Sequence, residues 1–304
     1  MLEELLSTKC FYKRDSMRFS EAMEMDEQND GRLVANFDRS WWVVNGPNGG
    51  IIAALMVRAA QHYLGRDRCV RTVTTHFMSA PREGPVGLAV TVERLGKIAG
   101  FAAVRMTQED RLIATALVAV AAVEPALHEW EQREFPILPT LENSWLMRTM
   151  PPRVPLHSRW ERYWGLGVPG VPETSTISGG YEAGGWIRLS EPEPYDEALL
   201  AAMADSWIPA IMAHTDFAVH APTLELTVQF RTDPRKMEMT ADTYCAAVFR
   251  QLSGSEGFID ETGEIWSPDG QLLVLSRQLA VLLPRSDEAV GKWEFVSPQF
   301  RERS

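Results

Sequence analysis

The sequence predicts an α+β protein built from two similar units, each an antiparallel sheet wrapped around one long helix. One observation is a repeated order of elements: a strand, a helix and four further strands occur once in each half of the 304-residue chain. The other is that each half offers a single long apolar helix, the only element available to cover one face of its sheet. We expect an N-terminal unit over residues 1–123, a proline-rich linker over 124–180 and a C-terminal unit over 181–304.

The first unit opens with a short strand, RLVANF (32–37), followed by a helix from about Gly50 to Leu64. The helix sequence is apolar on nearly every side, which is typical of a buried helix. Alternating or continuously apolar runs then predict four strands, the last two joined by the polar turn 108–110. These runs cover residues 71–78, 86–95, 100–108 and 111–123.

The second unit repeats this order after a stretch, 124–180, that holds eight of the nineteen prolines. A strand is predicted at 184–190 and a single helix from about Asp196 to Met212. Two half-covered sheets of this kind can pair through their edge strands, so we expect the two units to associate within the chain. The remaining predicted strands cover residues 222–230, 242–252, 257–266 and 271–283.

Composition narrows the possible partners and location. The formal net charge of −11 argues against nucleic acid or an anionic membrane surface as a partner. Three widely spaced cysteines indicate neither a disulfide framework nor a zinc site. The N-terminal segment lacks the apolar core of a signal peptide, and the longest apolar run, 112–123, is too short to span a bilayer. We therefore expect a cytoplasmic protein without a membrane span.

The start of the first helix, NGPNGGIIAALM, contains two adjacent glycines, Gly49 and Gly50. Glycine is a poor helix residue, so its position at a helix start needs a reason. One reading makes Asn48 a helix cap and the glycines turn residues. The other makes the open backbone N–H groups of the first helical turn a binding site for developing negative charge. On the second reading we expect the helix to tolerate a larger residue at Gly50.

Several motifs occur in the same order and spacing as in one known family. They are NGPNGGIIAALMVRAA, HFMSAP and VERLGKIAGFAAVRMTQEDRLIATA in the first half, and MADSWIPA, APTLELTVQFR and SPDGQLLVLSRQLAVL in the second. With these motifs the sequence resembles the double hot-dog acyl-CoA thioesterases of the bacterial thioesterase II type. The resemblance implies a tandem hot-dog fold, hydrolysis of an acyl-CoA to a free acid and CoA, and no cofactor or metal.

The resemblance also implies three catalytic residues, Asp205, Thr223 and Gln278, which together hold the attacking water. On a continuous helix, Asp205 falls at the edge of a broad apolar face, where partial burial raises the proton affinity of a carboxylate. By strict alternation, Thr223 lies on the strand face opposite Leu226. Gln278 lies inside an apolar run, so its amide must find hydrogen-bond partners there.

In this family the thioester carbonyl lies against the helix start of one unit, while the carboxylate comes from the other unit. The resemblance thus makes Asn48, Gly49 and Gly50 the oxyanion and substrate-binding residues, with the Gly50 N–H as the donor to the carbonyl oxygen. No phosphate-binding glycine loop, serine-hydrolase elbow or His-Glu-x-x-His motif points to another hydrolase class.

Two alternatives stay open at this stage. A non-catalytic acyl-CoA or lipid-binding protein could use the same groove, and a hot-dog hydratase or dehydratase would need an Asp/His pair. The sequence departs from the family pattern where VERL is followed by GKIAG and where Leu55 replaces a polar residue. The CoA contacts and the acyl-chain preference therefore remain open. We also expect a homo-oligomer, a dimer of two-unit chains, because one face of each sheet stays uncovered.

Overall fold

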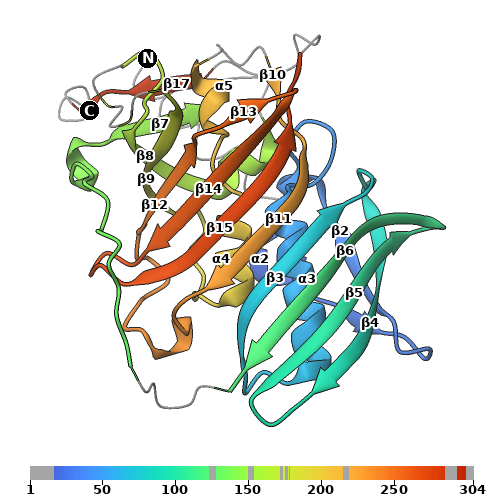
Figure 1. Cartoon of the computed structure of the whole chain (residues 1–304). Helices are drawn as coiled ribbons and strands as arrows, with labels where there is room; N and C mark the ends of the chain where they lie inside the picture. Colours follow the sequence, from blue (N-terminus) through green and yellow to red (C-terminus); the bar gives the residue numbers. More distant parts are fainter. Residues whose placement is uncertain are drawn as a thin grey trace, which may run out of the picture.

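The computed structural model describes residues 17–122, 128–149, 154–171, 174, 177, 179–214, 219–284 and 293–298. Its main feature is one long, strongly bent antiparallel sheet that runs through both units (Figure 1). Neighbouring strands follow the order β1-β2-β4-β5-β6-β3-β11-β15-β14-β12-β9-β8-β7-β17. Within the described residues, no helix is long and apolar enough to cross a membrane.

The first unit is the one that its sequence predicts. Its helix α3 (Gly49–Leu64) is buried along almost its whole length and packs against four strands of the sheet. Asn48 caps its start, and Gly65, with φ of 87°, ends it in a conformation that favours glycine. The strands of this unit are β2 (Leu33–Phe37), β3 (Cys69–Phe77), β4 (Gly84–Leu95), β5 (Ala99–Gln108) and β6 (Arg111–Ala121).

The strands of the second unit also match their predicted positions. The two units join through antiparallel pairing of β3 with β11, in which Val73 lies opposite Val228. A hydrogen bond of 2.9 Å between the hydroxyls of Thr74 and Thr227 ties the same two strands together on the sheet surface. This pairing confirms the expected edge-to-edge association of the units. The strands are β9 (Tyr181–Leu189), β11 (Thr223–Phe230), β12 (Cys245–Gln251), β14 (Phe258–Trp266) and β15 (Leu272–Val281).

The single helix predicted for 196–212 is wrong, because the chain forms two shorter helices there. The helices are α4 (Glu197–Met203) and α5 (Ala210–His214), separated by a turn and an extended stretch. Pro209 lacks a backbone N–H and disfavours helical geometry at the residue before it, so the helix cannot continue through this point. The Ser206 hydroxyl donates to the carbonyl of Met203 at 2.8 Å and satisfies one of the carbonyl groups left free at the end of α4.

The range expected to be a linker contributes strands to the second unit. β8 (Trp160–Leu166) pairs with β9, and β7 (Trp145–Thr149) pairs with β8, so the sheet extends beyond the repeat. Alternation was hidden in this range by prolines and by aromatic residues on both strand faces. The smaller elements are α2 (Phe19–Ala22), β1 (Asp26–Glu27), η1 (Arg39–Trp41), η2 (Leu141–Asn143), η3 (Pro155–Arg159), β10 (Val219–His220), η5 (Pro234–Lys236), β13 (Gly254–Ser255), β16 (Leu283–Pro284) and β17 (Trp293–Val296).

Candidate active site

The start of α3 meets the segment between α4 and α5, and this contact brings the two units together at one point. Asn48 is buried, with 6% of its surface exposed, and its Oδ1 accepts a hydrogen bond from the Gly50 N–H at 3.1 Å. Its Nδ2 donates to the backbone oxygen of Asp205 at 2.8 Å and to the Oδ2 of the same residue at 2.9 Å. The helix cap of the first unit therefore also holds the carboxylate of the second.

Asp205 lies in the break after α4 rather than on a continuous helix. Its Oδ2 accepts a second hydrogen bond from the Gly50 N–H, at 2.9 Å. The buried guanidinium of Arg162, on β8, donates to the carbonyl of Ser206 and fixes the segment from the other side. The helix break is thus what turns this carboxylate toward the start of α3.

The environment of Asp205 combines burial with donors. Burial raises the pKa of Asp205 to about 6, while hydrogen bonds from Gly50, Asn48 and Gly49 limit the rise. The positive end of the α3 dipole acts in the same direction as these hydrogen bonds. A carboxyl group with this pKa is ionised at neutral pH and is still basic enough to accept a proton from water.

The Gly50 N–H has acceptors within the protein itself. It donates to Oδ2 of Asp205 at 2.9 Å and to Oδ1 of Asn48 at 3.1 Å, while its donation to a substrate carbonyl stays a prediction. The start of α3 therefore binds a negative charge that belongs to the protein, the carboxylate of Asp205.

The expectation that the helix tolerates a larger residue at Gly50 is wrong. A Cβ at this position would lie 2.6 Å from the backbone oxygen of Ala202, since α3 and α4 cross closely here. A Cβ at Gly49 would instead lie 3.0 Å from the Oδ2 of Asp205 and 3.0 Å from Cζ of Phe77. Gly50 therefore serves packing as well as hydrogen bonding, and Gly49 keeps the space beside the carboxylate open.

Thr223 faces the interior, contrary to the alternation that we expected. The register of β11 against β15 shifts between Thr223 and Glu225, which makes Leu224 the extra residue of a β-bulge. Leu224 is 40% exposed, whereas Leu226 is 1% exposed. The bulge thus moves Thr223 onto the same face as Leu226, where its hydroxyl donates to the Oε1 of Gln278 at 2.8 Å.

Gln278 continues into a chain of buried polar side chains. Its Nε2 donates to the Oε1 of Glu261, which lies directly opposite on β14. The Oε2 of Glu261 accepts from the Nε2 of Gln251 at 2.9 Å, and the Oε1 of Gln251 accepts from the backbone N–H of Ile211 at 2.8 Å. Gln278, Glu261 and Gln251 are 7%, 5% and 4% exposed, so the chain lies in the protein interior.

Sequence reasoning missed Glu261 and Gln251. A signal for Glu261 existed, because it alternates in phase with the buried Ile259 and Ile265 and so carries a charge on the core face of its strand. Burial, together with the negative charge of Asp205, raises the pKa of Glu261 to about 7, against the hydrogen bonds that it accepts. The structure thus places Asp205 and the group of Thr223, Gln278 and Glu261 within electrostatic reach of each other. Within the described ranges, no direct hydrogen bond joins Asp205 to Thr223 or Gln278.

A related contact occurs where α4 begins. Asp196 caps α4, its Oδ1 accepting from the Leu199 N–H at 2.9 Å, and its Oδ2 accepts from Arg58 of α3. The start of α3 therefore meets a carboxylate of the second unit, whereas the start of α4 meets a guanidinium of the first.

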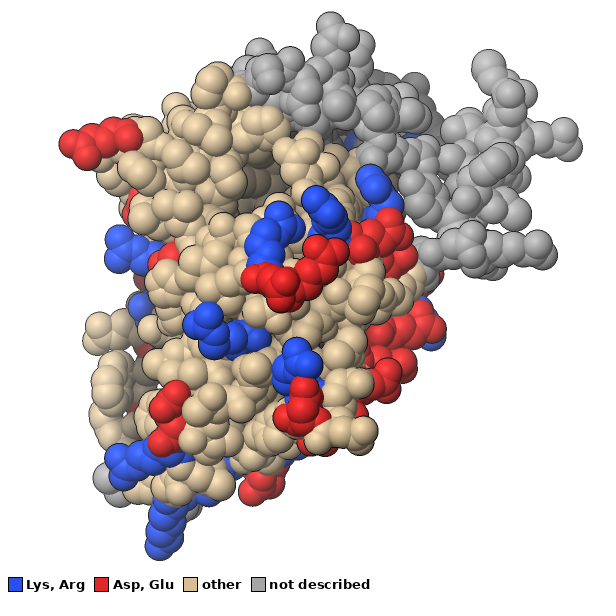
Figure 2. Space-filling model, turned by 90° about the vertical axis from the view of Figure 1, so that its right-hand side faces the viewer, with Lys and Arg blue, Asp and Glu red and all other residues tan. Residues whose placement is uncertain are grey.

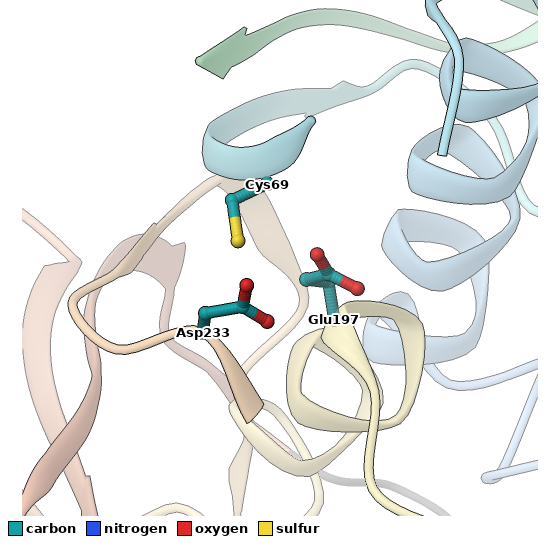
Figure 3. A group of neighbouring side chains, drawn as sticks. All are labelled: Cys69, Glu197 and Asp233. Atoms are coloured by element: carbon teal, nitrogen blue, oxygen red, sulfur yellow. The ribbon is translucent and has the colours of Figure 1, made fainter. Parts of the chain in front are cut away.

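Three side chains elsewhere have the composition of a metal site. Ligand atoms of Cys69, Glu197 and Asp233 all lie within 4.8 Å of one another (Figure 3). Arg235 already donates to both carboxylate oxygens of Asp233, at 2.9 and 3.0 Å, and to the Cys69 sulfur at 3.3 Å. The guanidinium of Arg235 thus already supplies positive charge to two of the three side chains. We therefore assign this cluster a structural role.

The surface near the first unit carries both signs of charge. Figure 2 shows Lys and Arg side chains interspersed with Asp and Glu on the face that it presents, rather than a continuous basic surface. Phosphate groups of a ligand would meet single basic side chains on this face and not a broad positive field.

Comparison with known proteins gives two matching family models. The model described as the acyl-CoA thioesterase N-terminal domain matches residues 38–122, and the one described as the acyl-CoA thioesterase C-terminal domain matches residues 133–282. The second match begins inside the proline-rich range, in agreement with the position of β7 and β8. No curated protein matches the sequence.

Solved structures share the fold at low sequence identity. A hot-dog-fold protein of unknown function from Alicyclobacillus acidocaldarius has 22% identity and a TM-score of 0.76, over 88% of this chain and 98% of that one. An acyl-CoA thioesterase II from Mycobacterium marinum has 16% identity and a TM-score of 0.70, over 88% of this chain and 99% of that one. The tandem hot-dog fold is confirmed by these matches.

Proposed function

We propose that the chain hydrolyses acyl-CoA thioesters through Asp205, because it belongs to the acyl-CoA thioesterase family by both of its domains. The observation that carries the proposal is the position of the Asp205 carboxylate, held at the start of α3 by Asn48 and Gly50. Such a carboxylate, with its pKa raised toward neutrality, suits a general base.

In the proposed reaction, Asp205 accepts a proton from a water molecule as the water oxygen attacks the thioester carbonyl carbon. A carbon–oxygen bond forms, and the carbonyl electrons move to the oxygen. When the tetrahedral intermediate collapses, the carbon–sulfur bond breaks and the proton on Asp205 passes to the departing sulfur. The products are a free acid and CoA. Thr223 and Gln278 orient the water, a role supported by their direct hydrogen bond.

The start of α3 has a second role in this mechanism. As Asp205 takes up the proton, its negative charge disappears and its hold on the Gly50 N–H weakens. At the same moment negative charge develops on the carbonyl oxygen, which then becomes the better acceptor. The Gly49 and Gly50 N–H groups can therefore change their acceptor during the reaction, from the Asp205 carboxylate to the carbonyl oxygen of the substrate.

One rival is a hot-dog hydratase or dehydratase with an Asp/His pair. Within the described part of the chain, the groups that donate to the Asp205 carboxylate belong to Asn48, Gly49 and Gly50, and no histidine is among them. This observation favours hydrolysis over hydration. The other rival, a non-catalytic acyl-CoA or lipid-binding protein, requires an activity measurement.

The experiment is a panel of acyl-CoAs of different chain length and polarity, with the released thiol measured colorimetrically. The wild-type protein should release CoA, and Asp205→Asn should lose this activity while still binding the same acyl-CoA. Binding without release in the wild type would support the non-catalytic rival, and neither binding nor release would refute the proposal.

The remaining proposals concern the assembly and setting. We propose a homo-oligomer formed through the outer sheet face, supported by the exposed apolar residues there; light scattering after gel filtration tests it. We also propose action in the cytoplasm on lipid-derived acyl groups, supported by the small number of cysteines, of which the described Cys69 and Cys245 are unpaired. On the outer sheet face the exposed apolar residues of β6, β11 and β15 include Leu117, Leu224 and Leu279.

A further inference from the structure

Glu261 is a buried carboxylate that neither the family resemblance nor the proposed reaction explains. It lies in the middle of β14, on the core face, with 5% of its surface exposed. Removing a carboxylate from water is costly unless it receives hydrogen bonds, so its partners are informative. Its side-chain partners are two amides, from Gln278 of β15 and Gln251 of β12, and the backbone N–H of Ala210 also donates to it.

These contacts fix the orientation of the Gln278 amide. In its ionised form Glu261 only accepts hydrogen bonds, so Gln278 then turns its NH₂ toward Glu261 and its carbonyl oxygen toward Thr223. The Thr223 hydroxyl must then donate its proton to Gln278. Its oxygen keeps lone pairs that can accept a hydrogen bond from a third group.

The other side of Glu261 is fixed as well. Gln251 accepts from the Ile211 N–H through Oε1 at 2.8 Å, so its NH₂ also faces Glu261. Because a backbone N–H can only donate, Gln251 cannot reverse its amide without placing two donors against each other. Thr223 can donate or accept, so the Gln278 amide has a second possible orientation and the Gln251 amide does not.

We propose that Glu261 is a positioning residue of the candidate site, which holds the Gln278 amide in the one orientation that leaves the Thr223 oxygen free to accept a hydrogen bond from the reacting water. The proposal rests on the proposed hydrolase function. The charged group that acts electrostatically on Glu261 is Asp205, in the segment before α5. Glu261 itself touches no reacting atom.

The test is Glu261→Gln, which replaces one of the two acceptor oxygens by a donor. Either Gln251 or Gln278 must then reverse, and Gln278 reverses more easily for the reason given above. The reversed amide would donate to Thr223 and redirect the hydroxyl proton toward the water. We expect kcat to fall by about 100-fold, as for a misoriented catalytic group, with KM little changed.

A double variant restores the orientation. In Glu261→Gln/Gln251→Glu, the carboxylate at position 251 accepts from the Ile211 N–H and from the new amide at 261, whose oxygen accepts from Gln278. We expect kcat to recover most of the loss. Glu264→Gln, which removes a carboxylate from the opposite face of the same strand, is the matched control and should leave kcat unchanged.

A spectroscopic readout separates this inference from the proposed function. With ¹⁵N-glutamine labelling, the Gln278 side-chain amide signals should move in Glu261→Gln and return toward their wild-type positions in the double variant. A wild type that releases no CoA from any acyl-CoA would overturn the proposed function and leave the amide signals to decide on Glu261. Unmoved Gln278 signals, or a double variant with kcat no higher than the single variant, would overturn the positioning role.

Discussion

Replacing Asp205 by asparagine should make the protein more stable and inactive at the same time. The side chains are nearly isosteric, and an amide oxygen can still accept from Asn48 and Gly50 in place of Oδ2. What disappears is the charge. The rise of the Asp205 pKa from 3.8 to about 6 means that ionising this group costs the folded protein about 3 kcal/mol relative to the unfolded chain.

The sign of the effect follows from the direction of the pKa shift. Between the unfolded and folded pKa values the folded state binds more protons, so the stability of the wild type falls as the pH rises through this window. Above pH 7 the cost is fully present, and below pH 4 it vanishes. The asparagine side chain of the variant does not titrate, so Asp205→Asn should exceed the wild type by about 1–3 kcal/mol at pH 8 and by nothing at pH 4.

Denaturant unfolding at both pH values, beside the thiol-release assay, measures the two effects on one preparation. Hydrolysis should fall by about 10²–10⁴-fold, the contribution of a general base. Asp110→Asn, in the exposed β5–β6 turn, is a control that should change neither quantity. A variant that is equally stable at pH 8, or one whose stability gain does not depend on pH, would refute the description of Asp205 as a desolvated base.

Three further outcomes follow from the site. In the wild type, kcat/KM should fall about tenfold per pH unit below the pKa of Asp205, near 6, and a pH-independent rate in this range would exclude the carboxylate as base. Gly50→Ala should lower the free energy of unfolding by about 1–3 kcal/mol through overpacking, because its Cβ would lie 2.6 Å from the backbone oxygen of Ala202. A variant as stable as the wild type in denaturant unfolding would show instead that α3 and α4 can move apart at no cost. Thr223→Ala and Gln278→Ala should have losses in kcat that do not multiply in the double variant, because both act on one water; losses that do multiply would mean separate roles.

Much of the fold could be predicted because it depends on local patterns. The apolar circumference of α3 and the alternation of the strands indicate their types wherever the chain is regular. The capping role of Asn48 was one of two readings, and the structure shows it together with a contact to Asp205 that no local pattern contains.

What the sequence did not show depends on irregular or distant features. The bulge at Leu224 reverses the direction of Thr223, and strict alternation cannot detect an extra residue. Pro209 is incompatible with one continuous helix over 196–212, but the prediction rested on apolar spacing that runs through this position and did not use that signal. The close approach of Ala202 to Gly50 joins segments far apart in the chain, so no window of sequence reveals it. Glu261 and Gln278 lie on adjacent strands, but a register shift between Ile265 and Trp266 hides their pairing from simple alternation.

In the proposed mechanism, the contacts at the starts of α3 and α4 limit one chain to a single site. At the start of α3 the second unit supplies Asp205, whereas at the start of α4 the first unit supplies Arg58. An arginine remains protonated at neutral pH, so it cannot take a proton from water. The fold is duplicated but the proton acceptor is not, so each chain should bind one equivalent of a tight-binding ligand. The second of the two equivalent contacts is an ion pair between Arg58 and Asp196, which holds α3 and α4 together.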